Sequence, residues 1–296
     1  MIARDAGIGF IGAGVLGNGL ALALSQHGYR VMGASSRRLE SAQALSERVH
    51  GCRAFETNQE LADAVDVVFI TTPDSVIAEV AESIGWRPGQ GVVHCCGASS
   101  AAILGPASGM GALTGAFHPL QTFAGLDSPG DAVARLVGVT FAVSGERVLA
   151  EFLAGLADDL GGRSITIADE DRPLYHASAV MACGYLVALM RAAVELWEEI
   201  GFTPDEAVGA LYPLARATVE NVHRRGLAGA STGPVVRGDT ETLHAHLEAL
   251  FQRLPELVPL YGDLVRLSLP LGARRGVGPD GLLAIEELVD HYSGVG

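Results

Sequence analysis

The sequence opens with a strand, a glycine turn and a helix, and this order constrains the fold more than any other feature. The apolar run Ile8–Ile11 leads directly into a Gly-x-Gly-x-x-Gly turn and then into a segment with helical periodicity. In such a unit the first glycine permits the tight turn, the second leaves room for a pyrophosphate, and the third lets helix and strand pack closely. The helix N-terminus then faces the phosphates. We therefore predict a dinucleotide site at Gly12, Gly14, Val15, Leu16 and Gly17.

The end of the second expected strand indicates which dinucleotide binds. After Arg30–Ala34 comes Ser35-Ser36-Arg37-Arg38, where an NAD enzyme usually has an acidic residue for the ribose hydroxyls. A guanidinium can pair with a 2′-phosphate through charge-assisted hydrogen bonds, and a serine hydroxyl can donate another. We interpret this segment as a site for NADP(H); the alternative is a solvated helix start. The missing acid also argues against S-adenosylmethionine.

Strand-like and helix-like runs alternate in the first half of the chain, which predicts an α/β fold with a Rossmann-type doubly wound parallel sheet. We expect this NADP-binding domain to span residues 1–168. Its expected strands are Ile8–Ile11, Arg30–Ala34, Val65–Thr71, Gly91–Cys95, Leu113–Phe117, Thr140–Val143 and the edge strand Ser164–Ile167. Its expected helices are Leu16–His27, Leu39–Val49, Asn58–Ala64, Val76–Ser83 and Glu146–Leu160.

Residues 169–296 are expected to form an all-α domain for substrate binding or dimerisation. A helix with Pro173 in its first turn runs without a breaker to about Ile200. Its middle is apolar all round, which predicts burial on every side, in a domain core or a homodimer core. Further helices are expected at Pro204–Arg224, Thr240–Arg253, Pro255–Leu269 and Asp280–His291, with a glycine-rich loop at Gly226–Gly238.

Composition excludes several classes of partner. The formal net charge is −14 and the basic clusters are scattered, so we expect no nucleic acid. The 4 cysteines show no C-x-x-C spacing, which predicts neither a metal site nor a disulfide framework and favours a cytoplasmic location. No leader pattern opens the chain, and the apolar run Ala177–Met190 is too short to span a bilayer, so we expect no membrane association.

Ligands of a doubly wound sheet bind outside the carboxyl ends of its strands, and three loops there carry polar groups. We expect Thr71, Thr72 and Pro73 to lie beside the nicotinamide half of the cofactor, or to form a turn that caps the next helix. In the next loop, Gly97 and the serines Ser99 and Ser100 either approach a ligand or cap a helix. The adjacent Cys95 and Cys96 are interpreted as packing residues.

The third loop contains His118 and Gln121, in the sequence His118-Pro119-Leu120-Gln121. We predict that both contact the substrate and that His118 either hydrogen-bonds it or transfers a proton near neutral pH. The alternative for His118 is a structural role.

The C-terminal half offers two further groups. Tyr175 and His176 lie in the first turn of the long helix, where a side chain can point back toward the sheet, and both are candidate catalytic residues. Thr232, Arg237 and Asp239 are candidate substrate contacts, with Arg237 as the anion-binding group. The alternative is an Arg237–Asp239 surface pair and a helix N-cap at Asp239.

Taken together, these motifs resemble those of a family of NADP oxidoreductases with a Rossmann-like domain followed by a helical domain of unknown function. The resemblance covers essentially the whole chain. The wider superfamily is similar to ketopantoate reductase, pyrroline-carboxylate reductase, prephenate dehydrogenase and the β-hydroxyacid dehydrogenases, which implies hydride transfer in a cleft between the domains. The residues that carry the resemblance are Gly12-x-Gly14-x-x-Gly17, Ser36-Arg37, Thr72-Pro73-Asp74, His118 to Phe123, Tyr175-His176-Ala177 and Thr232 to Asp239.

One departure from the superfamily bears on the chemistry. Many of these relatives carry a lysine on the first long helix of the second domain, whereas this chain contains no lysine. Proton delivery must then come from His176, His118, Tyr175 or water. We predict an NADP(H)-dependent reductase or dehydrogenase for a small carbonyl, hydroxy acid or imine, with a non-catalytic NADP-binding sensor or scaffold as the alternative.

Overall fold

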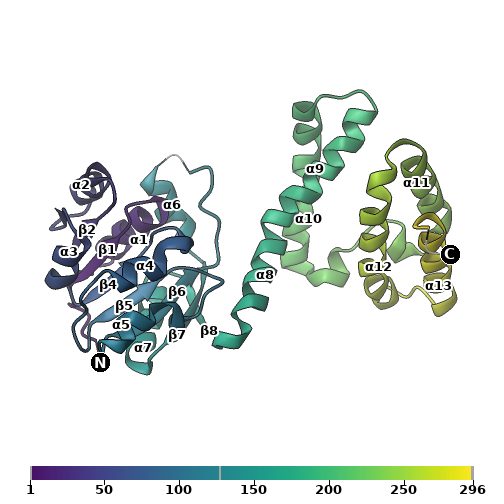
Figure 1. Cartoon of the computed structure of the whole chain (residues 1–296). Coiled ribbons are helices and arrows are strands. Elements are labelled where there is room, and N and C mark those ends of the chain that lie inside the picture. The colour runs from purple at the N-terminus through teal and green to yellow at the C-terminus, as the bar shows by residue number, and fades with distance from the viewer. Residues whose placement is uncertain (1, 127, 295–296) are drawn as a thin grey trace. The chain divides into compact units, whose positions relative to one another are not determined.

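The computed structural model describes residues 2–126 and 128–294. The chain divides into two compact units, Met1–Cys183 and Gly184–Gly296, and Figure 1 labels their elements. Helix α8 (Arg172–Ala182) makes its contacts within the first unit. The division after residue 168 into an NADP-binding domain and a substrate or dimerisation domain stays a prediction.

The first unit is built on an 8-stranded sheet with the order β3-β2-β1-β4-β5-β6-β7-β8. All neighbouring strands pair in parallel except β6 and β7, which are antiparallel. The strand order reverses between β1 and β4, where ligands bind in sheets of this type. The expected α/β class with a Rossmann-type sheet is confirmed. The strands are β1 Ile8–Ile11, β2 Val31–Ser35, β3 Arg53–Phe55, β4 Val67–Ile70, β5 Gly91–His94, β6 Leu113–Pro119, β7 Thr140–Gly145 and β8 Arg163–Thr166.

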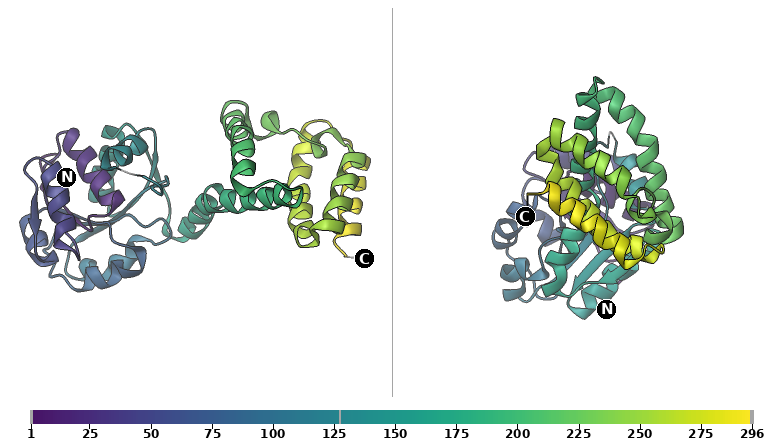
Figure 2. Two further views of the ribbon diagram at one scale, coloured as in Figure 1. Left: turned by 90° about the horizontal axis from the view of Figure 1, so that it is seen from above. Right: turned by 90° about the vertical axis from the view of Figure 1, so that its right-hand side faces the viewer.

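Two apolar cores cover the two faces of this sheet. Because successive side chains of a strand point to opposite faces, Phe10 and Phe69 enter one core, while Ile11 and Ile70 enter the other. Helices α1, α2, α6 and α7 close the first core, and α3, α4 and α5 close the second (Figures 1 and 2). Their bounds are α1 Val15–Gln26, α2 Leu39–Arg48, α3 Asn58–Ala64, α4 Ile77–Glu82, α5 Gly105–Gly109, α6 Pro129–Leu136 and α7 Arg147–Asp159, with short 3-10 turns at η1 Asp74–Val76, η2 Ala101–Leu104 and η3 Asp169–Asp171.

Several features of this unit differ from the sequence expectations. Sequence periodicity does not reveal β3, because three residues are too few to show alternation, and it does not reveal α5 or α6, which are short and rich in Gly and Pro. Strand β6 continues through His118 and Pro119, so His118 lies in the strand and not in the loop after it. The antiparallel β7 also means that the sheet is not parallel throughout.

Over its described residues, 184–294, the second unit contains helices and loops and no strand. The side chains of Leu243, Leu247, Ile285 and Val289 form the centre of its core, where α11, α12 and α13 pack together (Figure 2). Helix α10 extends to Ala230 with a kink at Gly226, so the expected glycine-rich loop begins later than predicted. The elements are α9 Gly184–Glu199, α10 Pro204–Ala230, η4 Val235–Arg237, α11 Thr240–Arg253, η5 Pro255–Leu257, α12 Val258–Arg274 and α13 Pro279–Tyr292.

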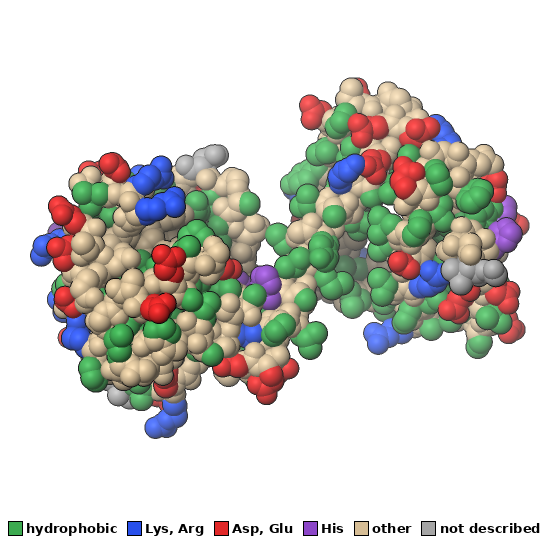
Figure 3. Space-filling view, in the orientation of Figure 1, with side chains coloured by type: hydrophobic (Ala, Val, Ile, Leu, Met, Phe, Trp, Pro, Cys, Tyr) green, Lys and Arg blue, Asp and Glu red, His purple; other side chains and the backbone are tan. Residues whose placement is uncertain are grey.

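The long apolar helix differs from its expectation in two ways. It is interrupted at Cys183, where α8 ends and α9 begins. Its apolar side chains are exposed in the single chain, for example Leu174 at 75%, Val187 at 68% and Met181 at 62% of their full area. The prediction of burial in a core of this chain is therefore wrong, while burial in a homodimer core stays a prediction. Hydrophobic side chains accordingly gather along this part of the surface in Figure 3.

This helical stretch is also longer than the apolar run considered in the sequence. The whole run Asp169–Glu199 has 31 residues, and its length and apolar composition would suffice to cross a bilayer, although Ala177–Met190 alone would not. Only 6% of its most apolar window is buried. A single helix of this kind is weak evidence for a membrane protein. A large exposed apolar surface marks a site of contact with another protein or with a membrane.

Candidate functional site

The glycine turn between β1 and α1 has the geometry that its sequence predicts. Gly12 has a φ of 104°, and a Cβ there would lie 2.8 Å from the carbonyl of Thr71. A Cβ on Gly17 would collide with the carbonyl oxygen of Gly12, so the helix packs on the turn as closely as a backbone allows. A Cβ on Gly14 would meet no atom within 4 Å. The turn therefore presents open space at the position of its second glycine.

Polar groups lie around this turn, and two of them lack hydrogen-bond partners among the described residues. The Thr71 hydroxyl donates to the carbonyl of Gly12 over 2.6 Å and so ties the end of β4 to the turn. The neighbouring Thr72 Oγ1 is buried and has no hydrogen-bond partner in the described residues, and the same holds for Asn18 Oδ1. Buried polar atoms are nearly always paired, so these two atoms suit a bound polar ligand. Val15 and Leu16 form the first turn of α1, and Pro73 is exposed at the start of η1.

The four residues at the end of β2 separate into two kinds. The Ser35 hydroxyl is buried and donates to Asn58 Oδ1 over 2.8 Å, so it holds β2 against α3. Ser36 is half-buried, and Arg37 and Arg38 are exposed. Neither arginine forms an ion pair with a described carboxylate. Two guanidinium groups at this position fit the 2′-phosphate of NADP(H).

A second group of polar side chains forms where β6 meets the first turn of α8. His118 Nδ1 lies 2.7 Å from Tyr175 Oη, although 57 positions separate them in the chain. The two rings meet edge to face at 5.6 Å, and the ring of His176 is 6.4 Å from that of His118. All three candidate catalytic residues therefore lie together within the first unit.

Gly97 leaves the space in which these rings sit. A Cβ at Gly97 would lie 2.8 Å from His118 Nε2 and 2.8 Å from His176 Cδ2. The absence of a side chain thus lets both imidazoles pack on the loop after β5. The loop itself is held by Ser100, which caps η2 through its hydroxyl, as the structural alternative for this serine predicts.

The charge states of the His118–Tyr175 pair follow from its surroundings. Burial, together with smaller effects of the charges of His176 and Arg172, lowers the pKa of His118 to about 4. Burial raises the pKa of Tyr175, while Arg172 acts in the opposite direction. At neutral pH the imidazole is therefore neutral and the phenol keeps its proton. Such a pair can pass a proton to an oxygen or nitrogen that gains charge beside it.

His94 has a structural task next to this pair. It is fully buried, its Nδ1 accepts from the backbone N–H of Cys96 over 3.1 Å, and its Nε2 lies 3.1 Å from the carbonyl of Ser100. These partners require the neutral tautomer with the proton on Nε2. Burial, with a smaller effect of Arg172, lowers the pKa of His94 to about 4. Burial also raises the pKa of the Cys95 thiol, which fits a packing role for that cysteine.

Gln121 lies apart from the catalytic candidates. Its side chain is exposed and contacts only nearby backbone: Oε1 accepts from the N–H of Thr122 over 2.8 Å, and Nε2 donates to the carbonyl of Arg135 over 3.4 Å. The bond to Arg135 links the segment after β6 to α6. Substrate contact by Gln121 stays a prediction.

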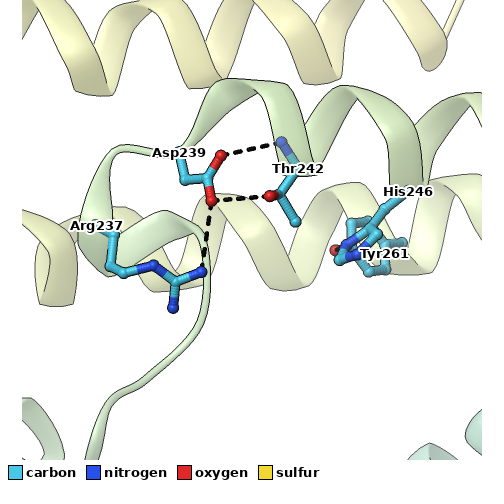
Figure 4. Close-up of polar contacts among 5 residues, drawn as sticks. All are labelled: Arg237, Asp239, Thr242, His246 and Tyr261. Atoms are coloured by element: carbon cyan, nitrogen blue, oxygen red, sulfur yellow. Dashed lines mark hydrogen bonds and ion pairs between the residues drawn. The ribbon is translucent and has the colours of Figure 1, made fainter.

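The predicted substrate contacts of the C-terminal half lie in the second unit (Figure 4). Asp239 caps α11 by accepting from the N–H of Thr242 over 3.0 Å, and Arg237 Nη2 lies 3.4 Å from the same carboxylate. This is the arrangement that the structural alternative describes. Thr232 lines a mostly apolar hollow of about 410 Å³ between α10 and α12. Anion binding by Arg237 therefore stays a prediction.

Sequence patterns do not reveal Arg172, although it is the most unusual side chain near the pair. Its guanidinium is fully buried, and it lies one helical turn before Tyr175. An arginine at the start of a helix after three acidic residues looks like a solvated side chain. The only available signal is its i, i+3 spacing from Tyr175, which places both on one face of α8.

A Rossmann sheet with an open glycine turn is the fold of many dinucleotide-dependent oxidoreductases. Residues 7–96 match the family described as NADP oxidoreductase coenzyme F420-dependent, and residues 139–267 match the domain of unknown function DUF2520. The chain is therefore an NADP-dependent oxidoreductase in which an NADP oxidoreductase domain precedes a DUF2520 domain. No curated protein matches its sequence.

Solved structures extend the comparison over nearly the whole chain. Protein TM1727 from Thermotoga maritima has a TM-score of 0.73 at 24% identity, over 90% of this chain and 98% of that one. BF3122 from Bacteroides fragilis, provisionally named an NADP oxidoreductase, has a TM-score of 0.68 at 27% identity, over 90% and 99%. 1-Pyrroline-5-carboxylate reductase from Streptococcus pyogenes has a TM-score of 0.57 at 17% identity, over 99% and 100%, which shows a shared fold.

Proposed function

We propose that this oxidoreductase reduces a small carbonyl or imine compound with NADPH, and oxidises the corresponding alcohol, hydroxy acid or amine in reverse. The observation that carries this proposal is the 2.7 Å contact between His118 and Tyr175, because a hydride acceptor that becomes negatively charged needs a proton donor beside it. When bound, the nicotinamide supplies the hydride.

The residues then have distinct roles in the proton step. Neutral His118 donates its Nδ1–H to Tyr175 Oη, which leaves the phenol proton free for the substrate. As hydride reaches the substrate carbon, Tyr175 gives this proton to the substrate oxygen or nitrogen, and the C=O or C=N bond becomes a single bond. His118 then passes its Nδ1 proton to the phenolate while its Nε2 takes up a proton from the solvent side, so that the imidazole stays neutral. His176, 6.4 Å from His118 between ring centres, connects the pair to solvent.

The chain lacks lysine, so its proton donor differs from a lysine-based one. A phenol suits either class of acceptor, since it is neutral before transfer and can serve an alkoxide or an amide anion. A solved structure with the same fold is a reductive aminase from Aspergillus terreus in complex with NADPH and ethyl-5-oxohexanoate, at 15% identity and a TM-score of 0.61. Together with the pyrroline-carboxylate reductase above, it supports testing imines and ketones first.

The proposal includes the assembly state. The exposed apolar side chains of α8 and α9 need cover in water, and a second copy of the chain would supply a matching apolar surface. We infer a homodimer for this reason, and we propose a cytoplasmic location. The roles of Gln121, Thr232, Arg237 and Asp239 as substrate contacts are part of the same proposal.

The test combines binding with turnover. NADPH and NADH are titrated by fluorescence, and NADPH oxidation is then followed with cyclic imines, ketones, 2-keto acids and β-keto acids. The proposal expects tighter binding of NADPH and oxidation with one of these classes. Tight NADPH binding without turnover of any class would favour the non-catalytic sensor or scaffold, and no dinucleotide binding would contradict the assignment altogether.

A further inference from the structure

Arg172 combines features that are rarely found together in one side chain. It is fully buried, yet it forms no ion pair with a described carboxylate. Its Nη2 donates to Ser144 Oγ over 2.9 Å, its Nη1 donates to the carbonyl of Cys96 over 3.5 Å, and its Nε has no partner within the described residues. A buried cation whose partners are all neutral lowers the stability of the folded protein. Such a cost suggests a role beyond packing.

The position of Arg172 indicates what that role is. The two hydrogen bonds join the first turn of α8 to the loop after β5 and to β7, three segments that are distant in sequence. Tyr175 lies one helical turn further along α8, and His176 follows it. On the other side, the carbonyl that Arg172 binds belongs to Cys96, directly before Gly97, on which His118 and His176 pack.

We infer that Arg172 is a positioning residue of the proposed site: it fixes the Tyr175–His176 turn against the loop after β5, and its positive charge balances the negative charge that Tyr175 carries after giving up its proton. This inference rests on the proposed function. It explains the missing carboxylate partner, because an acidic neighbour would cancel the charge before the phenolate forms. The cost of burying the cation is then offset when Tyr175 ionises.

Near the pair, Arg172 acts on Tyr175 as a positive charge, whereas His176 acts as one on His118. The remaining ionisable groups do not supply this charge. Buried His94 and His118 are neutral at pH 7, because the pKa of each is lowered to about 4. Asp74 raises the pKa of His118, and Asp169 raises the pKa of Arg172, as negative charges do. Neither carboxylate can therefore stabilise a phenolate. The ionisable and charged groups that act on Tyr175, His118 or Arg172, besides these three residues themselves, are His176, His94, Cys96, Asp74 and Asp169.

The decisive experiment compares Arg172→Gln and Arg172→Lys with the unchanged protein. Carbon-13 NMR of tyrosines labelled at Cζ follows the ionisation of Tyr175, whose signal is assigned from its loss in Tyr175→Phe. In Arg172→Gln we expect the pKa of Tyr175 to rise by about one unit, since an opposite charge close to an acid lowers its pKa by that much or more. We expect Arg172→Lys, which keeps the charge, to restore most of this shift.

Turnover is measured on the same samples. Arg172→Gln should lower kcat at least about tenfold and move the basic limb of its pH profile upward, with the NADPH dissociation constant unchanged. Arg163→Gln is the matched control, because Arg163 is an exposed arginine that also donates to a hydroxyl, Thr140 Oγ1, over 2.8 Å. A merely structural arginine would lower kcat without moving the Tyr175 titration, and this result would overturn the charge role.

The experiment also distinguishes an inactive wild type from a variant that does not fold. If the wild type binds NADPH but turns over no substrate, the proposed function fails, while the NMR titration still decides whether Arg172 acts on Tyr175. If Arg172→Gln does not fold, Ser144→Ala removes the acceptor of the Nη2 bond and leaves the arginine in place. We then expect a loss of about tenfold in kcat, the cost of a hydrogen bond to a charged group. An unchanged kcat and an unchanged Tyr175 titration in Ser144→Ala would contradict the inference.

Discussion

At the scale of single residues, the proposed site depends on side chains that burial keeps uncharged. His94 and His118 both have their pKa lowered to about 4, from an unfolded value of 6.5. In each case the unfolded chain binds a proton at a higher pH than the folded protein does. Stability should therefore be complete above about pH 6.5 and decrease as the pH falls toward 4. The slope is at most about 1.4 kcal/mol per pH unit for each histidine.

Replacing His94 by Gln should remove one of these two contributions. The free energy of unfolding, measured by urea denaturation at several pH values between 4.5 and 7, should then depend on pH about half as steeply as in the wild type. His27→Gln, a change at an exposed histidine, is the control and should leave the slope as it is. A slope in His94→Gln equal to that of the wild type would show that His94 is not held neutral by burial.

Some residues of the candidate site could be assigned from the sequence, and others could not. Gly12 and Gly14 could be assigned from sequence because their task is local: one needs a positive φ and the other needs open space. The 2.7 Å contact of His118 with Tyr175 could not, because it depends on how α8 packs against β6. Arg172 could not be recognised either, since the same residue type at a helix start is normally solvated.

At the scale of elements, the carboxyl end of β2 carries the cofactor preference. Arg37 is exposed and forms no ion pair with a described carboxylate, so its charge is available for a 2′-phosphate. Arg37→Glu should weaken NADPH binding about 100-fold and NADH binding by less than about threefold, because only NADPH carries that phosphate. Fluorescence titration measures both constants.

The control for this variant is Arg48→Glu, which makes the same change of charge at the other end of α2. It should reduce NADPH binding only slightly, since exposed charges separated by more than the Debye length are largely screened at physiological salt. An equal loss of NADPH and NADH affinity in Arg37→Glu would contradict the assignment of this loop to the phosphate.

The sequence likewise predicts those helices and strands that local patterns encode, and misses those that depend on distant contacts. The strong alternation of strands and helices gave the order of the main elements, and β1, β2, β4 and β5 lie within a few residues of their expected bounds. The short β3 and the antiparallel β7 depend on pairing with neighbouring strands, which no local pattern encodes.

At the scale of the whole molecule, the exposed apolar helix surface is the feature that most needs a partner. Composition could show that α8 and α9 are apolar, but not what covers them. If a second copy does, a charge placed there should break the assembly, because an unpaired charge is costly in an apolar interface. Val187→Glu should then shift the protein from dimer to monomer in size-exclusion chromatography with light scattering.

Val137 gives a matched control, since it is also 68% exposed and lies outside this helix. Val137→Glu should leave the mass in solution unchanged. A wild type that is monomeric at all concentrations, or that is recovered with membranes, would contradict the homodimer and redirect attention to another cover for the helix.

The central claim is that Tyr175, paired with His118, supplies the proton for an NADPH-dependent reduction. The most direct test measures NADPH oxidation with the best imine or ketone substrate by the wild type, Tyr175→Phe and Tyr185→Phe. Tyr185→Phe is the control, because Tyr185 is 63% exposed on α9. The account predicts a fall in kcat of about 100-fold or more in Tyr175→Phe alone, with unchanged NADPH affinity. Equal rates in all three proteins would contradict it.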